Sequence, residues 1–366
     1  MWPLPVCGPR PDQPPSHGLS PRVISRHDLT RVQYDALPEE SKASILPNKK
    51  VINISTTPGG LVVQCADGTS YEGSVVIGAD GAHSRVRRIM RALAVKAKLP
   101  EDDINDELPF LTSYRAMWIR FPTQADLRPG DATETHGHDC TIQTFAGEGT
   151  SVIGMYERIP EPTRDAPRYG PADEEAFVAR WGHLPLSDRL SVRDAYDSRV
   201  QAGLVNLEEG VVKHWGWDRI VLIGDAAHKF TPSTGAGCNN GMADVAVLVN
   251  ELHRVVLDAG AGAVSAEQID AAIDGYQHAR HEAVEAGCDQ AGKATATATW
   301  KSPAFRLVDQ FVMPCHRAQK FFMGKAAPRI ARAPVLDFVP VGEAPQGKVP
   351  WAPVVSVVEV RTVGGD

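Results

Sequence analysis

Two aspartates follow short apolar runs, and each is flanked by glycine. Asp80 stands in Gly78-Ala79-Asp80-Gly81 after the run 74–77, and Asp225 follows the run 219–224. Near-continuous apolar runs of this length are typical of strands buried on both faces of a parallel sheet. Because open α/β sheets bind ligands at the carboxyl ends of such strands, we expect both carboxylates at a binding site.

A glycine-rich loop follows the second aspartate. It contains Pro232 and continues as Gly235-Ala236-Gly237-Cys238-Asn239, where a helix over about 239–257 is predicted to begin. With so little side-chain bulk, the backbone N–H groups of the loop can approach a planar ring closely. The positive end of the helix favours negative charge, as on a reduced flavin. The loop therefore predicts a site for such a ring.

The first motif also has a purely structural interpretation. Gly81 fits a tight Asp-Gly turn, and Ser84 fits the N-cap of a following helix. For this motif taken alone, both interpretations stay open.

The elements that would position these motifs can be predicted coarsely. Ser25 is an N-cap for a helix to about Leu37, and strands over 51–54, 61–65 and 69–71 form a β-meander. The middle of the chain alternates like an antiparallel sheet, and the second half is largely helical. We expect middle strands at 116–121, 141–145 and 151–156, parallel strands at 74–78 and 219–224, and helices at 173–181, 239–257 and 266–293.

This order indicates an α/β fold in which a cofactor domain is interrupted by a mixed or antiparallel β-sheet substrate domain. The expected divisions are an irregular proline-rich leader, a partial cofactor domain with the meander, the substrate sheet, the continued cofactor domain and a C-terminal segment. Their boundaries are 1–21, 22–105, 106–212, 213–300 and 301–366.

Composition excludes several classes of protein. The net charge of −7 gives no reason to expect a nucleic-acid partner, and the six cysteines have no paired spacing for zinc or disulfides. No apolar run reaches the roughly 18 residues that a membrane span needs. We expect a cytoplasmic protein and leave peripheral membrane contact open.

The two motifs together resemble the downstream flavin motifs of the p-hydroxybenzoate hydroxylase-like monooxygenases. The first is Gly-x-Asp-Gly with Ser84-x-Val86-Arg87, and Gly-Asp-Ala-Ala-His with Gly-x-Gly-x-Asn follows about 145 residues later. The variant at 228–232, His-Lys-Phe-Thr-Pro, is similar to a fungal branch that acts in secondary metabolite biosynthesis. The resemblance covers roughly residues 22–300.

The resemblance implies a Rossmann-like FAD-binding domain and assigns roles to the motif residues. Asp225 would bind the ribityl chain of FAD, and the loop from Pro232 through Gly235, Gly237 and Cys238 to Asn239 would face the isoalloxazine. Asp80 with Gly81, and Arg26, would lie near the pyrophosphate or ribose. The implied activity uses NADPH and O₂ to hydroxylate or epoxidise an apolar aromatic or prenylated natural-product intermediate.

Other side chains have weaker claims to a role. Arg115 at the start of the substrate sheet is a candidate catalytic residue, but a solvated arginine is the alternative. His228 fits a general acid or base, although a histidine hydrogen-bonded to backbone is expected instead. His136, His138 and Cys140 lack a fourth metal ligand, so no metal site is predicted. Core packing or a solvated helix face is expected for the rest, namely Trp118, Phe121, Phe145, Tyr156, Arg85, Arg87, Arg88, Arg91 and Lys96.

One family feature is missing from the sequence. Relatives begin with a strand, a Gly-x-Gly-x-x-Gly turn and a helix, whereas the first 21 residues here contain seven prolines and only Gly8 and Gly18. Losing about three charge-assisted hydrogen bonds to the pyrophosphate would cost on the order of 5–8 kcal/mol. We therefore expect an N-terminally incomplete member that binds FAD weakly. A gene-model fragment, an inactive truncation and a flavin-independent, cyclase-like or ligand-binding scaffold are the three explanations.

Overall fold

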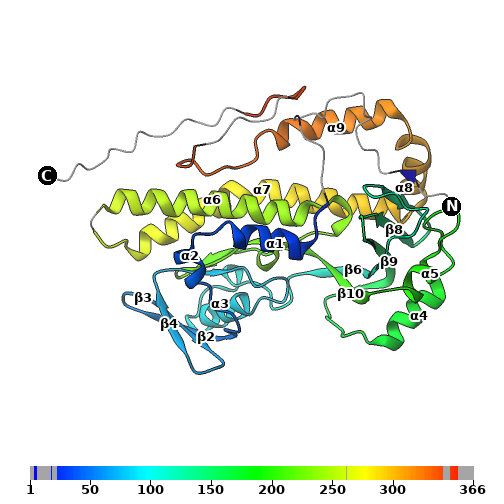
Figure 1. The fold of residues 1–366 in the computed structure, drawn as a ribbon. Coiled ribbons are helices and arrows are strands. Elements are labelled where there is room, and N and C mark those ends of the chain that lie inside the picture. Colours follow the sequence, from blue (N-terminus) through cyan, green and yellow to red (C-terminus); the bar gives the residue numbers. More distant parts are fainter. Residues whose placement is uncertain (1–3, 6–17, 19–22, 261, 341–346, 353–366) are drawn as a thin grey trace.

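Two long helices organise the molecule. The computed structural model describes residues 4–5, 18, 23–260, 262–340 and 347–352. Helices α6 (Ala236–Ala259) and α7 (Ala266–Ala298) run along the molecule, with two small sheets beneath one end and a large sheet near the other (Figure 1). Both helices were predicted, and each extends a few residues beyond the predicted bounds.

The small sheets lie beside α3 (Arg85–Lys96). Strands β2 (Val51–Thr57), β3 (Gly60–Cys65) and β4 (Ser70–Gly73) form the predicted meander. The second sheet has the order β11-β12-β5, formed by Gly216–Trp217, Ile220–Leu222 and Val76–Gly78, and β5 is parallel to β12 as predicted.

The two parallel strands differ in burial. All three residues of β12 are fully buried, but Ile77 of β5 is 45% exposed. The prediction that both strands are buried on both faces is therefore wrong for β5. The reason is its position, because β5 is the outermost strand and no described strand pairs with its free edge.

The large sheet has seven strands in the order β1-β7-β8-β9-β6-β10-β13, and all its pairs are antiparallel. The expectation of a mixed or antiparallel sheet is thereby narrowed to antiparallel. Leu4–Pro5 form β1 at the sheet's edge, where proline is tolerated; apart from Gly18, the rest of the predicted leader lies outside the described residues. The other strands are β6 (Leu111–Pro122), β7 (Ala132–Thr135), β8 (Cys140–Phe145), β9 (Thr150–Thr163), β10 (Gln201–Val211) and β13 (His228–Lys229).

The two faces of this sheet have different surroundings. One face packs against α4 (Pro171–Trp181) and α5 (Val192–Asp197) in a core that includes Phe121. By the strand register, the side chains of Trp118 and Tyr156 both lie on the opposite face of the sheet, toward α7. Phe121 is therefore separated from the other aromatic side chains with which it was grouped.

The N-terminal and C-terminal helices are less buried. Helix α1 (Arg26–Asp35) has the predicted Ser25 cap, but its expected apolar stripe is not covered, since Val32 is 61% exposed. Helix α2 (Glu39–Ala43) follows. The C-terminal segment, which the sequence left unassigned, forms α8 (Pro303–Leu307), a π-helical turn (Val308–Val312) and α9 (His316–Ile330).

Candidate functional site

Asp80 caps a helix. Its carboxylate accepts hydrogen bonds from the hydroxyl of Ser84 and from the N–H groups of Arg85 (2.7 Å) and Val86 (3.1 Å), at the beginning of α3. Ser84 in turn accepts from the N–H of Arg87, as the structural interpretation of the motif required. A carboxylate has about four lone-pair sites. Asp80 therefore has little capacity left for a ligand, and Gly81 supports the turn with a φ of 83°.

Asp225 is placed very differently. It follows β12 in a short 3-10 turn (Gly224–Ala226), and its side chain is exposed with no hydrogen-bond partner among the described residues. Gly224 has a φ of 56°, and the Cα of Gly241 lies 3.9 Å from the position that a Gly224 Cβ would take. The turn thus lies against α6, and the positive φ favours glycine at position 224. Of the two aspartates, Asp225 is the one whose carboxylate is free to bind a ligand.

A buried carboxylate fixes this turn to the helices. Asp244 on α6 accepts hydrogen bonds from the Gly224 N–H (2.9 Å), the Arg280 Nε (2.9 Å) and the His228 Nε2 (2.6 Å). Burial alone would raise the pKa of Asp244, but these partners lower it below its ordinary value. His228 is therefore bound to a side chain rather than to backbone as predicted, and its ring packs against Trp215. Asp244 lies 16 residues further along the chain on α6, so the residue pattern around His228 does not indicate this partner.

Arg87 joins the two motifs. Its guanidinium is buried and donates to the carbonyls of Ala226 (2.8 Å) and Ala82 (2.6 Å), with the Phe110 ring 4.9 Å from its carbon. The prediction of a solvated arginine is wrong at this position. Arg87 instead holds the turn that carries Asp225 against the first motif.

The glycine loop opens toward free space. Gly235 has a φ of 63° and precedes α6, and a Cβ added at Gly235 or Gly237 would meet no atom within 4 Å. No side chain caps the first N–H groups of α6, and Cys238 and Asn239 are exposed. Pro232, also exposed, begins the preceding 3-10 turn. Free N–H groups at the start of a long helix favour an anionic or hydrogen-bond-accepting ligand.

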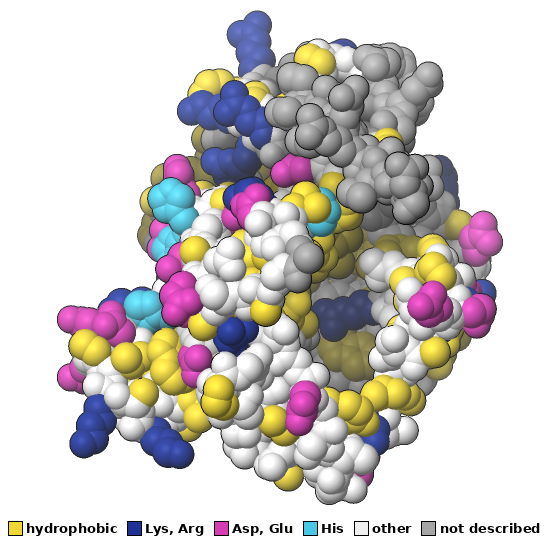
Figure 2. All heavy atoms as spheres, turned by 90° about the vertical axis from the view of Figure 1, so that its left-hand side faces the viewer, with side chains coloured by type: hydrophobic (Ala, Val, Ile, Leu, Met, Phe, Trp, Pro, Cys, Tyr) yellow, Lys and Arg dark blue, Asp and Glu magenta, His cyan; other side chains and the backbone are white. Residues whose placement is uncertain are grey.

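These residues fit the flavin end of FAD. Nothing lies within 4 Å of a Cβ added at Gly235 or Gly237, the start of α6 supplies N–H donors, and Asp225 supplies a free acceptor for hydroxyl groups. Among the residues that the structure describes, we find no comparable site for the ADP end: the sequence contains no Gly-x-Gly-x-x-Gly turn, and Asp80 is already hydrogen-bonded. Figure 2 shows a deep hollow on one face of the molecule, with basic side chains in its depth and hydrophobic ones around it.

The two remaining predicted residues lie elsewhere. Arg26 begins α1, and its side chain is exposed. Arg115 forms an ion pair with the buried Glu157, and its guanidinium carbon lies 5.6 Å from the Phe177 ring, within the core below α4. Its side chain is 28% exposed and lies on the face of the sheet that packs against α4, not on the face toward α7. The structure thus gives Arg115 a structural ion pair and no position from which to act on a ligand at the loop.

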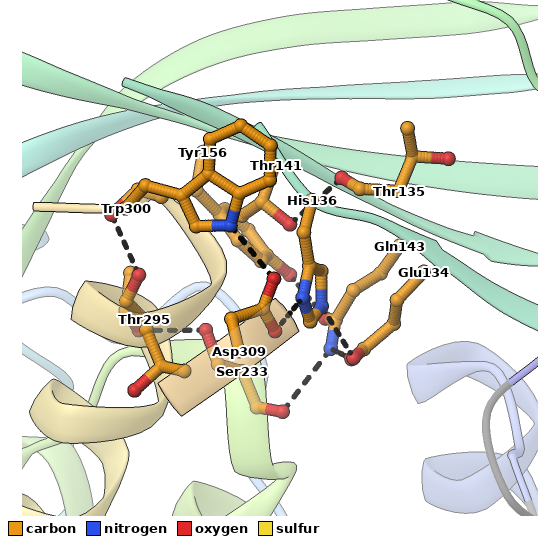
Figure 3. Close-up of polar contacts among 12 residues, drawn as sticks. Glu134, Thr135, His136, Thr141, Gln143, Tyr156, Ser233, Thr295, Trp300 and Asp309 are labelled. Carbon is orange, nitrogen blue, oxygen red and sulfur yellow. Dashed lines mark hydrogen bonds and ion pairs between the residues drawn. The ribbon is translucent and has the colours of Figure 1, made fainter. Parts of the chain in front are cut away.

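A network of hydrogen-bonded polar side chains connects the glycine loop to α7 and to the large sheet. Ser233 shares a hydrogen bond between its hydroxyl and that of Thr295 on α7 (2.6 Å), and its carbonyl accepts from the amide of Gln143 on β8 (3.1 Å). The same amide nitrogen donates to Glu134, and the Tyr156 hydroxyl donates to the Gln143 carbonyl oxygen (2.7 Å) (Figure 3). The sequence pattern did not identify Gln143, because only the pairing of β7, β8 and β9 brings these groups together.

His136 connects this network to the C-terminal segment. Its ring nitrogens contact Asp309 (2.7 Å) and Glu134 (3.1 Å), and Trp300 donates to the second oxygen of Asp309 (2.7 Å) (Figure 3). Burial alone would lower the pKa of His136, but the two carboxylates raise it to about 9. His136 is therefore a charged structural link. In the part of the chain that the structure describes, no group of side chains is arranged to hold a metal ion.

The segment that carries these residues also matches a known protein family. A family model described as an FAD binding domain matches residues 188–291, which include Asp225 and the glycine loop. Among solved structures, Klebsiella pneumoniae HpxO complexed with FAD and uric acid has a TM-score of 0.62 at 18% identity, over 84% of this chain and 72% of that one. A salicylate hydroxylase substrate complex has a TM-score of 0.55, also at 18% identity, over 81% and 75%. At these identities the likeness shows the fold. None of the described helices is both long and apolar enough to cross a bilayer.

The curated relatives are fungal enzymes. The FAD-dependent monooxygenase spyC of Aspergillus fumigatus is 30% identical over 332 residues, which are 88% of this chain and 68% of spyC. The FAD-dependent monooxygenase ausM of Penicillium brasilianum is 28% identical over 294 residues, 80% of this chain and 61% of ausM. The chain thus spans about three fifths to two thirds of the length of these relatives. The chain belongs to the family of FAD-dependent monooxygenases that these fungal proteins represent.

Proposed function

We propose that this chain acts as an FAD- and NADPH-dependent monooxygenase that hydroxylates or epoxidises an apolar aromatic or prenylated intermediate of secondary metabolism. The observation that carries the proposal is the free carboxylate of Asp225 beside an open glycine loop at the start of α6. When bound, FAD reduced by NADPH supplies the chemistry that activates O₂ and transfers one of its oxygen atoms.

The chain's own residues have distinct tasks at such a site. Asp225 accepts hydrogen bonds from the ribityl hydroxyls, and the loop at Gly235 and Gly237 lets the backbone lie close to the ring. The N–H groups at the start of α6 stabilise negative charge on the ring. Asp244 and Arg87 are buried, and their hydrogen bonds keep the Gly224–Asp225 turn in place.

The proposal of an apolar substrate is supported by the face of the large sheet that lies toward α7. One cross-strand row contains Gln143, Gly154, Trp118 and Gly203. A Cβ at Gly203 would lie 2.8 Å from the Trp118 ring nitrogen, so the absence of a side chain lets the indole lie across the neighbouring strand. Val205 and Val152 on the same face are 46% and 37% exposed. Because Gln143 of this row also contacts Ser233, the apolar surface adjoins the glycine loop.

The fold alone does not decide the reaction. A structure titled as the Diels-Alderase PyrE3 also matches, with a TM-score of 0.53 at 19% identity over 76% of this chain and 55% of that one. A flavin-independent activity on an apolar ligand is therefore the outcome against which the proposal is tested.

The test is the visible absorbance of the purified chain with added riboflavin and added FAD. We expect a bound-flavin spectrum with both, because the flavin end of the site is present, and dissociation constants within about tenfold of each other, because no pyrophosphate turn is present. Adding NADPH to the FAD complex should bleach the spectrum. A protein that binds neither flavin at millimolar concentration would refute the monooxygenase proposal for this chain.

A pair of variants locates the binding. Asp225→Ala should weaken riboflavin binding by about tenfold or more, the loss of a charge-assisted hydrogen bond. Asp258→Ala, which removes another exposed carboxylate from the far end of α6, should leave the affinity unchanged. Equal effects of the two substitutions would mean that the flavin binds elsewhere.

A further inference from the structure

The amide of Gln143 is fixed in one orientation by three groups of different kinds. Its nitrogen donates to the Ser233 carbonyl and to a Glu134 oxygen, and its oxygen accepts from the Tyr156 hydroxyl. Reversing the amide would set its oxygen against two acceptors. Burial raises the pKa of Tyr156, so its hydroxyl stays a donor. Gln143 itself is 7% exposed, so water cannot replace these partners cheaply.

The partners of Gln143 are themselves held. Glu134 receives a second contact from His136, which is held in turn by Asp309 (2.7 Å) of the π-helical turn. Burial alone would raise the pKa of Glu134, but the bonds from His136 and Gln143 lower it, so its oxygens stay acceptors. Figure 3 shows this series of contacts running from the C-terminal segment through the sheet to Ser233. The amide therefore points at the loop because several segments constrain it.

Ser233 is hydrogen-bonded to α7 as well as to the large sheet, and it lies next to the turn that Gly235 closes. Its hydroxyl contacts Thr295 of α7, and Thr295 also donates to Thr231 (2.8 Å) in the same loop. The N–H of Gly235 donates to the carbonyl of Pro232 (2.9 Å), which closes the turn immediately beside Ser233. A shift of the Ser233 carbonyl would therefore move Gly235 and the start of α6.

We infer that Gln143 is a positioning residue for the glycine loop: through its bond to the Ser233 carbonyl, it holds Gly235 and Gly237 in the conformation that accepts the flavin ring. This role rests on the proposed function only for the identity of the ligand. This role gives the large sheet a second task, because strand β8, which borders the apolar surface, also sets the shape of the loop.

The test replaces the donor without changing the shape. Gln143→Glu keeps the oxygen that accepts from Tyr156 but removes the N–H groups that donate to Ser233. At pH 8 we expect a riboflavin dissociation constant at least about tenfold weaker, and amide hydrogen exchange at Gly235 about tenfold faster in the flavin-free protein. At pH 5.5 the introduced carboxyl, buried beside Glu134, is protonated and regains one O–H donor in place of the two N–H groups, so both deficits should be smaller at that pH than at pH 8.

Two further variants separate positioning from general damage. Gln201→Glu places the same change at an exposed residue of β10 and should alter neither measurement. Gln143→Met removes the donor without adding charge, and it should loosen the loop as much at pH 5.5 as at pH 8. If Gln143→Glu does not fold, Gln143→Met alone decides, by the same hydrogen-exchange measurement.

The outcomes distinguish this inference from the proposed function. If no variant and no wild-type protein binds flavin, but exchange at Gly235 accelerates only in the Gln143 variants, the positioning role stands and the flavin proposal fails. If riboflavin binds and the Gln143 variants match wild type in affinity and exchange, the inference is overturned. Equal changes in Gln201→Glu, or no recovery of Gln143→Glu at pH 5.5, would overturn it as well.

Discussion

Replacing Asp244 with alanine removes one carboxylate that three donors share. The Gly224 N–H, the His228 ring and the Arg280 guanidinium all direct a hydrogen bond at it, and none of its surface is exposed. Arg280 is only 6% exposed at its side chain, so water cannot readily solvate the charge that the substitution leaves unpaired. The second partner of Arg280, Asn240, is neutral.

The size of the effect follows from these contacts. Removing one partner of a buried ion pair costs about 3–5 kcal/mol, because the remaining charge stays buried and uncompensated. Domains are stable by only about 5–15 kcal/mol, so Asp244→Ala should remove a large fraction of the free energy of unfolding. Replacing Arg280 with methionine in the same chain removes the unpaired charge. The double variant should therefore be more stable than Asp244→Ala alone.

The assay is urea unfolding followed by circular dichroism at pH 7, with Asp258→Ala on the same helix as the control. We expect Asp258→Ala to lie within about 0.5 kcal/mol of wild type, as exposed substitutions usually do. The reasoning is refuted if Asp244→Ala is as stable as that control. It is also refuted if adding Arg280→Met destabilises the Asp244 variant further, because the buried charge would then not be the source of the loss.

Three other substitutions test separate parts of the structure. The pKa of His136 is raised from 6.5 to about 9, so its ion pairs contribute on the order of 3 kcal/mol to the free energy of unfolding below pH 6.5. This contribution is lost as the pH rises through 9. His136→Gln should therefore flatten the fall in the free energy of unfolding between pH 7 and 10. Gly235→Ala, at a φ of 63°, should cost about 1 kcal/mol and weaken riboflavin binding, whereas Gly59→Ala, with open space and no positive φ, should do neither. Arg87→Met leaves the Ala226 carbonyl unpaired and should cost about 2–4 kcal/mol by thermal unfolding, a result that a change below 1 kcal/mol would contradict.

Local patterns were enough to predict most elements and the Asp225 loop. The N-caps at Ser25 and Ser84, the meander turns and the runs at β5 and β12 all depend on residues close in sequence. The predictions that failed here concern the burial of side chains. Ile77 and Val32 belong to patterns that predict a covered face, and covering them needs a neighbouring element that a residue pattern does not name.

The polar contacts that shape the site were beyond the reach of such patterns. Arg87 and Ala226 are 139 residues apart, and His136 and Asp309 are 173 apart. A charged residue on a predicted helix is exposed far more often than it is buried and paired, so Arg87 was expected on a solvated face, and His136 was weighed only as a metal ligand. Only the topology of the sheets shows that each has a partner within reach.

The two aspartates show why motif and role must be separated. Asp80 and Asp225 both follow parallel strands and each has a glycine as a direct neighbour, so both were predicted near a ligand, although only the Asp80 motif also had a structural interpretation. Ser84 stands four residues after Asp80 and draws that carboxylate into a helix cap, whereas Asp225 is followed by apolar Ala226 and Ala227, which are buried and offer no side-chain donor. The N–H of Gly224, in the turn that carries Asp225, already donates a hydrogen bond to Asp244. Asp225 is left unpaired because Asp244 accepts the hydrogen bond of the turn in its place, and its exposed carboxylate is therefore free to accept one from a ligand.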